Sequence, residues 1–170
     1  MIEIRRAGEK QIPKIIKLAD ELWPATFTSI LSAKQIAYMM EMMYSRESLE
    51  KQMNDGHQYA IVMENDVDVG YVSYEINHDN SDKTKIHKLY ILPEHQRKGI
   101  GKIVVDYVAQ EARRSQNSAL FLNVNKHNQS AIGFYEKHGF FLVKKEVIDI
   151  GNGFIMDDFV FELELNETEN

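Results

Sequence analysis

A short glycine-containing segment holds the residues best suited to bind an anion. The stretch "QRKGIG", residues 96–101, follows an apolar run that stops at Pro93 and directly precedes a helical pattern. The first N–H groups of a helix lack partners within the helix and carry partial positive charge. Gly99 and Gly101 have no Cβ, so a bulky anion can approach the backbone, and Arg97 and Lys98 add charged donors. The pattern predicts an anion site, although a solvated glycine-rich connector has the same composition.

Two well-known phosphate motifs do not fit this turn. The pattern G-x-x-x-x-G-K-[ST] fails because Gln96 occupies the first glycine position and Ile103 the hydroxyl position. The dinucleotide pattern G-x-G-x-x-G fails because Val104 occupies the third glycine position. Another mode of anion binding is therefore expected.

Periodicity predicts the elements that position this segment. "IEIRRA" alternates like a strand, and a helix begins near Ile12, with Pro13 in its first turn and Pro24 helping to end it. A second helix is predicted over residues 32–44, with Ser32 as its N-cap. A third begins at Ile100, directly after the glycine segment.

The remaining segments read mainly as strands. The predicted strands are "HQYAIVME", "VDVGYVSYEI", "KIHKLYIL", "SALFLNV", "FFLVKKEVIDI" and "FIMDDFVFELEL", the last two joined by the turn "GNG". "NQSAIGFYEKHG" reads as a short helix with Asn128 or Ser130 as its cap and Gly139 at its end. We expect one mixed α/β domain over residues 1–170, with "NETEN" as a frayed end.

Composition narrows the class of protein. Hydrophobic residues make up 44% and charged residues 27%, as in globular proteins. The lack of cysteine excludes disulfides, a thiol nucleophile and cysteine-based zinc sites, and fits a reducing compartment, so we expect a cytoplasmic protein without a metal. The charged N-terminus and the absence of a long apolar run predict neither a signal peptide nor a membrane span. The net charge of -6 disfavours nucleic acid as a partner.

Two motifs together resemble the GNAT superfamily of N-acetyltransferases, whose members bind acetyl-coenzyme A. "QRKGIG" matches the signature Q/R-x-x-G-x-G/A, and "NQSAIGFYEKHGF" is similar to the segment N-x-x-A-x-x-F-Y-x-x-x-G-F. The stretch "LWPATFTSILSAKQIAYMM" is similar to the spermine/spermidine acetyltransferase-like branch. The resemblance implies a single mixed, mostly antiparallel sheet with helices on both faces and a central pair of parallel, splayed strands.

The resemblance also implies where the cofactor binds. The backbone of the strand "KLYIL" would pair with pantetheine, the amides of residues 96–101 would hold the pyrophosphate, and Asn128 and Lys137 would add contacts. The implied cofactor residues are Leu89, Tyr90, Ile91, Gln96, Arg97, Lys98, Gly99, Ile100, Gly101, Asn128 and Lys137. From the residues alone, the strand can equally be core, Asn128 a helix cap and Lys137 a solvated side chain.

The resemblance assigns the proton donor more firmly than the proton acceptor. Tyr135 matches the tyrosine that protonates the departing thiolate, although a tyrosine beside Phe134 also suits aromatic packing. Many members carry a glutamate on the strand before the glycine segment, but "KTKIHKL" has no carboxylate. His87 is the titratable candidate there. Glu75, a water chain and uptake of the neutral amine remain alternatives.

The acceptor is expected to be a small primary amine. The first two helices usually line the acceptor side in this family, which makes Trp23, Phe27 and Tyr38 candidates, with core packing as the alternative. The acidic balance and the branch resemblance favour a polyamine, ahead of a peptide α-amine or a lysine side chain. A different acyl donor, a non-catalytic acetyl-CoA sensor and a homodimer are left open.

Overall fold

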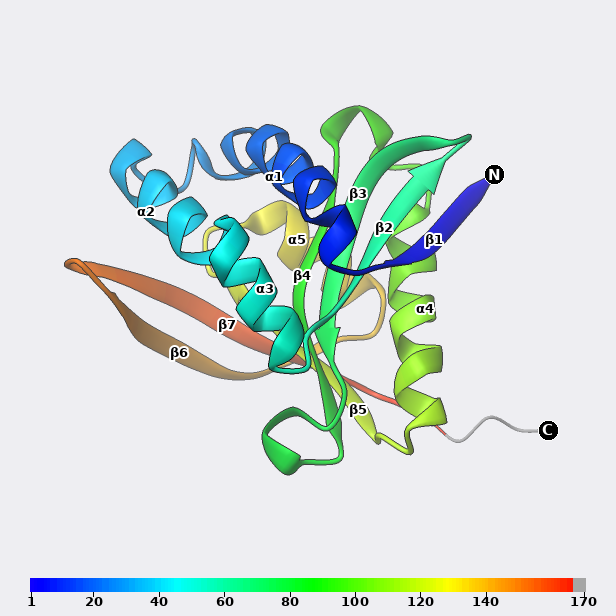
Figure 1. Cartoon of the computed structure of the whole chain (residues 1–170). Coiled ribbons are helices and arrows are strands. Elements are labelled where there is room, and N and C mark those ends of the chain that lie inside the picture. The colour runs from blue at the N-terminus through cyan, green and yellow to red at the C-terminus, as the bar shows by residue number, and fades with distance from the viewer. Residues whose placement is uncertain (167–170) are drawn as a thin grey trace. The chain divides into compact units, whose positions relative to one another are not determined.

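The computed structural model describes residues 1–166, and over these the chain forms seven strands and five α-helices (Figure 1). The strands are β1 (Ile2–Ala7), β2 (Gln58–Glu64), β3 (Val67–Glu75), β4 (Lys83–Ile91), β5 (Ala119–Asn125), β6 (Phe141–Gly151) and β7 (Phe154–Glu164). The helices are α1 (Ile12–Phe27), α2 (Ala33–Tyr44), α3 (Arg46–Asn54), α4 (Ile100–Arg114) and α5 (Gln129–Lys137). All the strands predicted from periodicity are confirmed.

The strands form one mixed sheet in the order β1-β2-β3-β4-β5-β7-β6. The pairs β1–β2, β2–β3, β5–β7 and β6–β7 are antiparallel. Residues 83–86 of β4 pair in parallel with residues 119–122 of β5. A parallel pair needs a crossover connection, and the chain between these strands contains α4. The predicted mixed, mostly antiparallel sheet with a parallel pair is confirmed.

Contacts divide the chain into two compact units. The first comprises Met1–Glu75 and Lys88–Asp106, and the second Ile76–His87 and the described part of Tyr107–Asn170. Strand β4 contributes its first part to the second unit and the rest to the first. The expectation of one domain over residues 1–170 stays a prediction, and all but the first residue of "NETEN" lie outside the described residues. Within residues 1–166, no helix has the length and apolar character needed to cross a bilayer.

Helix α1 runs past its predicted end. Pro24 lies inside the helix, which continues to Phe27. Proline lacks an N–H, but its carbonyl still accepts a hydrogen bond from the Thr28 amide at 3.2 Å. The Phe27 ring also packs on the Trp23 ring, with their centroids 4.4 Å apart. The prediction that Pro24 helps to end the helix was therefore wrong.

Helix caps follow the predicted chemistry more closely. Ser32 caps α2 by accepting a hydrogen bond from the Gln35 amide at 3.1 Å, as predicted. Asn128 caps α5 by accepting from the Ala131 amide at 3.2 Å. Gly139 follows α5 with a φ of +92°, which fits the expected left-handed end.

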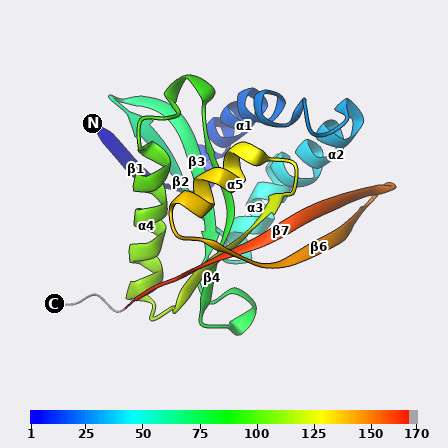
Figure 2. The same ribbon diagram turned by 180° about the vertical axis from the view of Figure 1, so that it is seen from behind.

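The hairpin of β6 and β7 extends from the second unit as a long twisted ribbon (Figure 2).

Gly70 lets β3 and β4 come unusually close in the first unit. A Cβ at this position would lie 2.2 Å from the Tyr90 carbonyl oxygen and 2.8 Å from Cδ1 of Ile91. A bulge follows Val62 in β2, opposite Gly70, and the Leu92 amide donates to the Val69 carbonyl at 2.8 Å. Gly70 therefore fixes how the end of β4 packs against β3.

We expect Gly70→Ala to lower the free energy of unfolding by about 1–3 kcal/mol, because the added methyl group must push the Tyr90 backbone away. Urea unfolding measures this change. Gly133→Ala is the matched control, since a Cβ there meets nothing within 4 Å and alanine favours the helix. Equal stability of Gly70→Ala and the native protein would contradict the close approach.

Candidate functional site

The glycine segment forms a strand-to-helix turn in the first unit. A 3-10 turn at Pro93–His95 follows β4, and α4 begins at Ile100. Gly99 has a φ of +79°, and its carbonyl accepts from the Ile103 amide at 3.3 Å. The amides of residues 100–102 thus precede the first donor of the helical pattern. This is the arrangement of an anion site at a helix N-terminus.

The turn is shaped by its own side chains and backbone. The Gln96 side-chain amide donates to the Ile91 carbonyl at 2.8 Å, which closes the segment onto the end of β4. Arg97 has a φ of +64°, an uncommon conformation for a residue with a side chain. Arg97 and Lys98 are exposed, whereas Ile100 is buried under the start of α4. The segment therefore presents backbone amides and two basic side chains at one turn.

Aromatic rings surround the side chain of Tyr90 on β4. The Tyr90 ring lies 6.1 Å from Trp23, 6.2 Å from Phe27 and 5.7 Å from Tyr71, measured between centroids. Trp23 and Phe27 are only 2% and 6% exposed. The structure thus brings two predicted acceptor residues together with a predicted cofactor-strand residue, in a buried cluster. Tyr38 lies half-buried on α2.

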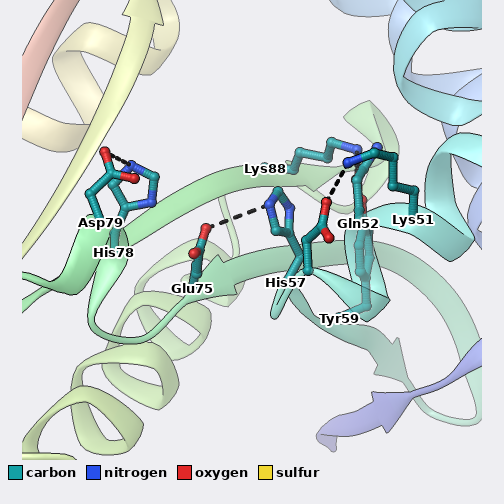
Figure 3. A network of polar contacts seen from close by, with 9 residues as sticks. Lys51, Gln52, His57, Tyr59, Glu75, His78, Asp79 and Lys88 are labelled. Carbon is teal, nitrogen blue, oxygen red and sulfur yellow. Dashed lines mark hydrogen bonds and ion pairs between the residues drawn. The ribbon is translucent and has the colours of Figure 1, made fainter.

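Lys88 is buried next to this cluster, in the apolar register of β4. Its side chain shares a strand face with Ile86 and Tyr90 and is 7% exposed. Figure 3 shows Lys88 beside Tyr59 and Gln52; the ammonium donates to the Tyr59 hydroxyl at 2.6 Å and to the Gln52 side chain at 3.0 Å. It also lies 4.2 Å from the Tyr44 ring centroid. Burial lowers the pKa of Lys88 to about 7. This amine therefore loses its proton far more readily than an exposed lysine does.

Glu75, one candidate proton acceptor, is paired with a histidine in the first unit. Its carboxylate lies 3.5 Å from Nε2 of His57, and both side chains are about one-fifth exposed (Figure 3). An opposite charge or a hydrogen bond stabilises the ionised carboxylate. The pair links the residue before β2 to the last residue of β3.

His87, the other candidate proton acceptor, lies in the second unit. Its ring packs edge-on against His78, with centroids 5.6 Å apart, and His78 contacts Phe121 at 5.5 Å. His78 also lies 3.3 Å from the Asp79 carboxylate. His87 and Lys88 are consecutive on β4, so their side chains point to opposite strand faces.

Helix α5 and its N-cap carry three predicted site residues. Tyr135 is 7% exposed, and its ring contacts Phe134 and Phe140 edge-on, each at 5.2 Å between centroids. Burial raises the pKa of Tyr135 above its usual range, so the phenol keeps its proton at neutral pH. Asn128 caps the helix, and Lys137 is exposed in the last turn. The structure thus shows Tyr135 packed against aromatic rings and Asn128 acting as a helix cap, two alternatives that the sequence left open.

A buried carboxyl on β7 was not anticipated from the sequence. Asp158 is 2% exposed, and burial raises its pKa. The Asn123 side chain on β5 donates to Asp158 at 3.3 Å and to Glu146 on β6 at 3.2 Å. Asn123 thus holds two carboxyl groups from two strands. An aspartate within the otherwise apolar "FIMDDFVF" is the sequence signal that marks this position.

Comparisons with known proteins point to one family. The model of the acetyltransferase (GNAT) family matches residues 16–140. An uncharacterised N-acetyltransferase of Lactobacillus delbrueckii subsp. lactis is 22% identical over 89% of this chain and 91% of its own length. The spermidine N(1)-acetyltransferase of Thermoplasma acidophilum is 27% identical over 92% and 96% of the two chains. The peptidyl-lysine N-acetyltransferase YjaB of Salmonella typhimurium is 26% identical over 95% and 99%.

Solved structures show the same fold. The PaiA N-acetyltransferase of Thermoplasma acidophilum, solved with coenzyme A, superposes with a TM-score of 0.79 at 23% identity and covers 96% of this chain and 99% of its own. A GCN5-related N-acetyltransferase of Rhodopseudomonas palustris gives a TM-score of 0.80 at 16% identity, with 96% and 95% covered. At these identities the likeness concerns the fold.

Proposed function

The chain belongs to the acetyltransferase (GNAT) family, and from that premise we propose that it transfers an acetyl group from acetyl-coenzyme A to a primary amine. The observation that carries this proposal is the turn at residues 96–101, where Gly99 has a left-handed φ and the first amides of α4 follow it. Backbone amides at a helix start suit a pyrophosphate. The relative solved with coenzyme A supports the choice of cofactor.

The proposed cofactor contacts come from three segments of the chain. Gln96, Gly99, Ile100 and Gly101 form the pyrophosphate seat, with Arg97 and Lys98 adding charge. The backbone of β4 at Leu89, Tyr90 and Ile91 pairs with pantetheine, whose amides match strand donors and acceptors. Asn128 and Lys137 add contacts from α5. The Ile91 carbonyl also accepts from the Gln96 side chain at 2.8 Å.

The reaction is a direct transfer. The amine nitrogen attacks the thioester carbonyl, the C–S bond breaks, and the thiolate takes the Tyr135 proton while the amine loses one of its own. His87 and Glu75 are the candidate acceptors of that proton, alongside water. A high pKa suits Tyr135 to this role, because the phenol arrives protonated.

A polyamine or another small amine is the proposed acceptor. The spermidine acetyltransferase among the relatives and the net charge of -6 support a cationic substrate. Trp23, Phe27 and Tyr38 are proposed to shape the acceptor side. The peptidyl-lysine acetyltransferase among the relatives makes a peptide or protein amine the second candidate. A cytoplasmic location and a homodimer stay predictions.

Thiol release tests the activity directly. The protein is incubated with acetyl-CoA and, in turn, polyamines, amino acids and peptides with a free α-amine or lysine. We expect thiol release with at least one small amine. Binding of acetyl-CoA without release for any acceptor would indicate a sensor, and no binding of coenzyme A would overturn the proposed function.

We expect Gly99→Val to weaken coenzyme A binding by at least about tenfold, measured by calorimetry, because the side chain both disfavours a φ of +79° and occupies the space in front of the amides. Gly56→Val is the matched control. Gly56 also has a positive φ, +103°, and open space at its Cβ position, but lies after α3. Unchanged affinity in a folded Gly99→Val variant would contradict close backbone approach.

A further inference from the structure

Glu64, the last residue of β2, contacts two residues of the connection between β4 and α4 at positions 93–99, called the glycine turn from here on. Its carboxylate lies 2.6 Å from Nδ1 of His95 and 3.4 Å from the ammonium of Lys98. The Glu64 and His95 side chains are 18% and 24% exposed, so this contact is partly shielded from water, whereas Lys98 is 49% exposed. All three residues belong to the first unit. The hydrogen bond from His95 is the main cause that lowers the pKa of Glu64, which keeps the carboxylate ionised at neutral pH.

Glu64 is itself held in place on a rigid support. It pairs with Ile2 of β1 and with Val67 of β3. The tight turn that follows has positive φ values at Asn65 and Asp66, as two-residue hairpins require. The N-terminal ammonium donates to the Asn65 side chain at 2.6 Å, which ties β1 to the same turn. The backbone of Glu64 is thus held between β1 and β3, which fixes the position of its carboxylate.

The glycine turn, in contrast, contains conformations that need outside support. Arg97 and Gly99 both have positive φ values, and the left-handed region is unfavourable for an arginine. The turn is anchored at its start by the hydrogen bond from Leu92 to Val69. Among the side chains of residues 1–166, Glu64 supplies the contacts to its middle, at His95 and Lys98.

We propose that Glu64 is a positioning residue for the cofactor: it holds the turn of residues 93–99 in the shape that receives the pyrophosphate, through its contact with His95. This rests on the proposed function. The carboxylate does not touch the anion in this scheme; it acts through His95 and the backbone that follows. A bond between a carboxylate and a histidine is charge-assisted and thus strong enough to select one loop conformation.

The charge of Glu64 can affect cofactor binding in two opposite ways. A negative group beside the seat of an anion repels that anion and competes for Lys98. If repulsion were the main effect, removing the charge would strengthen cofactor binding. If positioning is the main effect, removing it weakens binding. The two effects predict opposite changes in one dissociation constant.

The test is coenzyme A binding to Glu64→Gln, measured by calorimetry on the full chain. We expect the dissociation constant to rise about tenfold, with kcat at saturating acetyl-CoA changed less than about twofold, since the chemistry is untouched. Glu50→Gln is the matched control: it removes the same charge from an exposed ion pair with Arg46 on α3. An unchanged or lower dissociation constant for Glu64→Gln overturns the proposal.

A double mutant separates positioning from general loss of stability. We expect His95→Ala to weaken binding as much as Glu64→Gln, and the double variant to be no weaker than His95→Ala alone. Additive losses would show that Glu64 does not act through His95. Comparison with Gly99→Val distinguishes failure of this inference from failure of the proposed function. If Gly99→Val weakens binding but Glu64→Gln does not, only this inference fails; if the native protein binds no coenzyme A, the proposed function fails.

Discussion

The Tyr135→Phe variant is expected to lose about 10²-fold or more in kcat, while its affinity for acetyl-CoA stays near that of the native protein. The substitution keeps the ring that packs against Phe134 and Phe140 and removes only the hydroxyl group. Without that proton the thiolate must leave as a free anion or wait for water. The loss therefore appears in the chemical step rather than in binding.

The measurement is thiol release under saturating acetyl-CoA and acceptor, with binding measured separately by calorimetry. Tyr107→Phe is a suitable control, because it removes the hydroxyl of a half-buried tyrosine on α4 that has no proposed role. A kcat within about threefold of the native value would remove Tyr135 from the mechanism, since general-acid loss costs more. It would leave the phenol as a packing residue of α5.

Much of the fold could be predicted because its signals are local. Alternation and apolar runs mark every strand, and Ser32 and Asn128 mark helix starts through their own side-chain bonds. Helix α3 gave no comparable pattern, because Leu49 is its single buried residue. Its position depends instead on distant bonds, such as that from Gln52 to the Met43 carbonyl at 2.8 Å. Pro24 was expected to help end α1, but the helix continues to Phe27, whose ring packs on Trp23.

In the candidate site, too, features with local sequence signals could be predicted and those that depend on distant partners could not. The glycine turn was predictable, because a strand end, two glycines and a helix start are consecutive in the sequence. Glu64 and Lys88 were not predicted, because their importance comes from partners 31 and 29–36 residues away. A lysine in an alternating apolar strand was the available signal for Lys88. Its burial depends on α2, α3 and β2 packing around it.

The buried amine of Lys88 makes stability depend on pH. Its pKa is about 7 in the folded chain and about 10.4 in an unfolded one. Between these values the unfolded chain binds more protons, so the free energy of unfolding rises with pH across this window. Below pH 7 both states are protonated, and the full cost of burying the charge applies. Above pH 10 both are neutral, and the cost disappears.

We expect Lys88→Met to be more stable than the native protein at pH 6 to 7 and to lose this advantage towards pH 10. The charge term changes by roughly 4–5 kcal/mol over that window. Two lost hydrogen bonds offset about 1–3 kcal/mol of the gain, although Tyr59 can still donate to Gln52. The pH-dependent part of the difference comes from the titration of Lys88, which is absent in the methionine variant.

Urea unfolding of both proteins at each pH unit from 6 to 10 measures this difference directly. Subtracting the two curves removes the titration of all other groups. Lys34→Met, which replaces an exposed lysine on α2, should follow the native curve within about 0.5 kcal/mol at every pH. A difference between Lys88→Met and the native protein that is constant from pH 7 to 10 would show that the amine keeps its proton in the folded state. Tyr44, Tyr59 and Gln52 would then stabilise the ammonium enough to offset its burial.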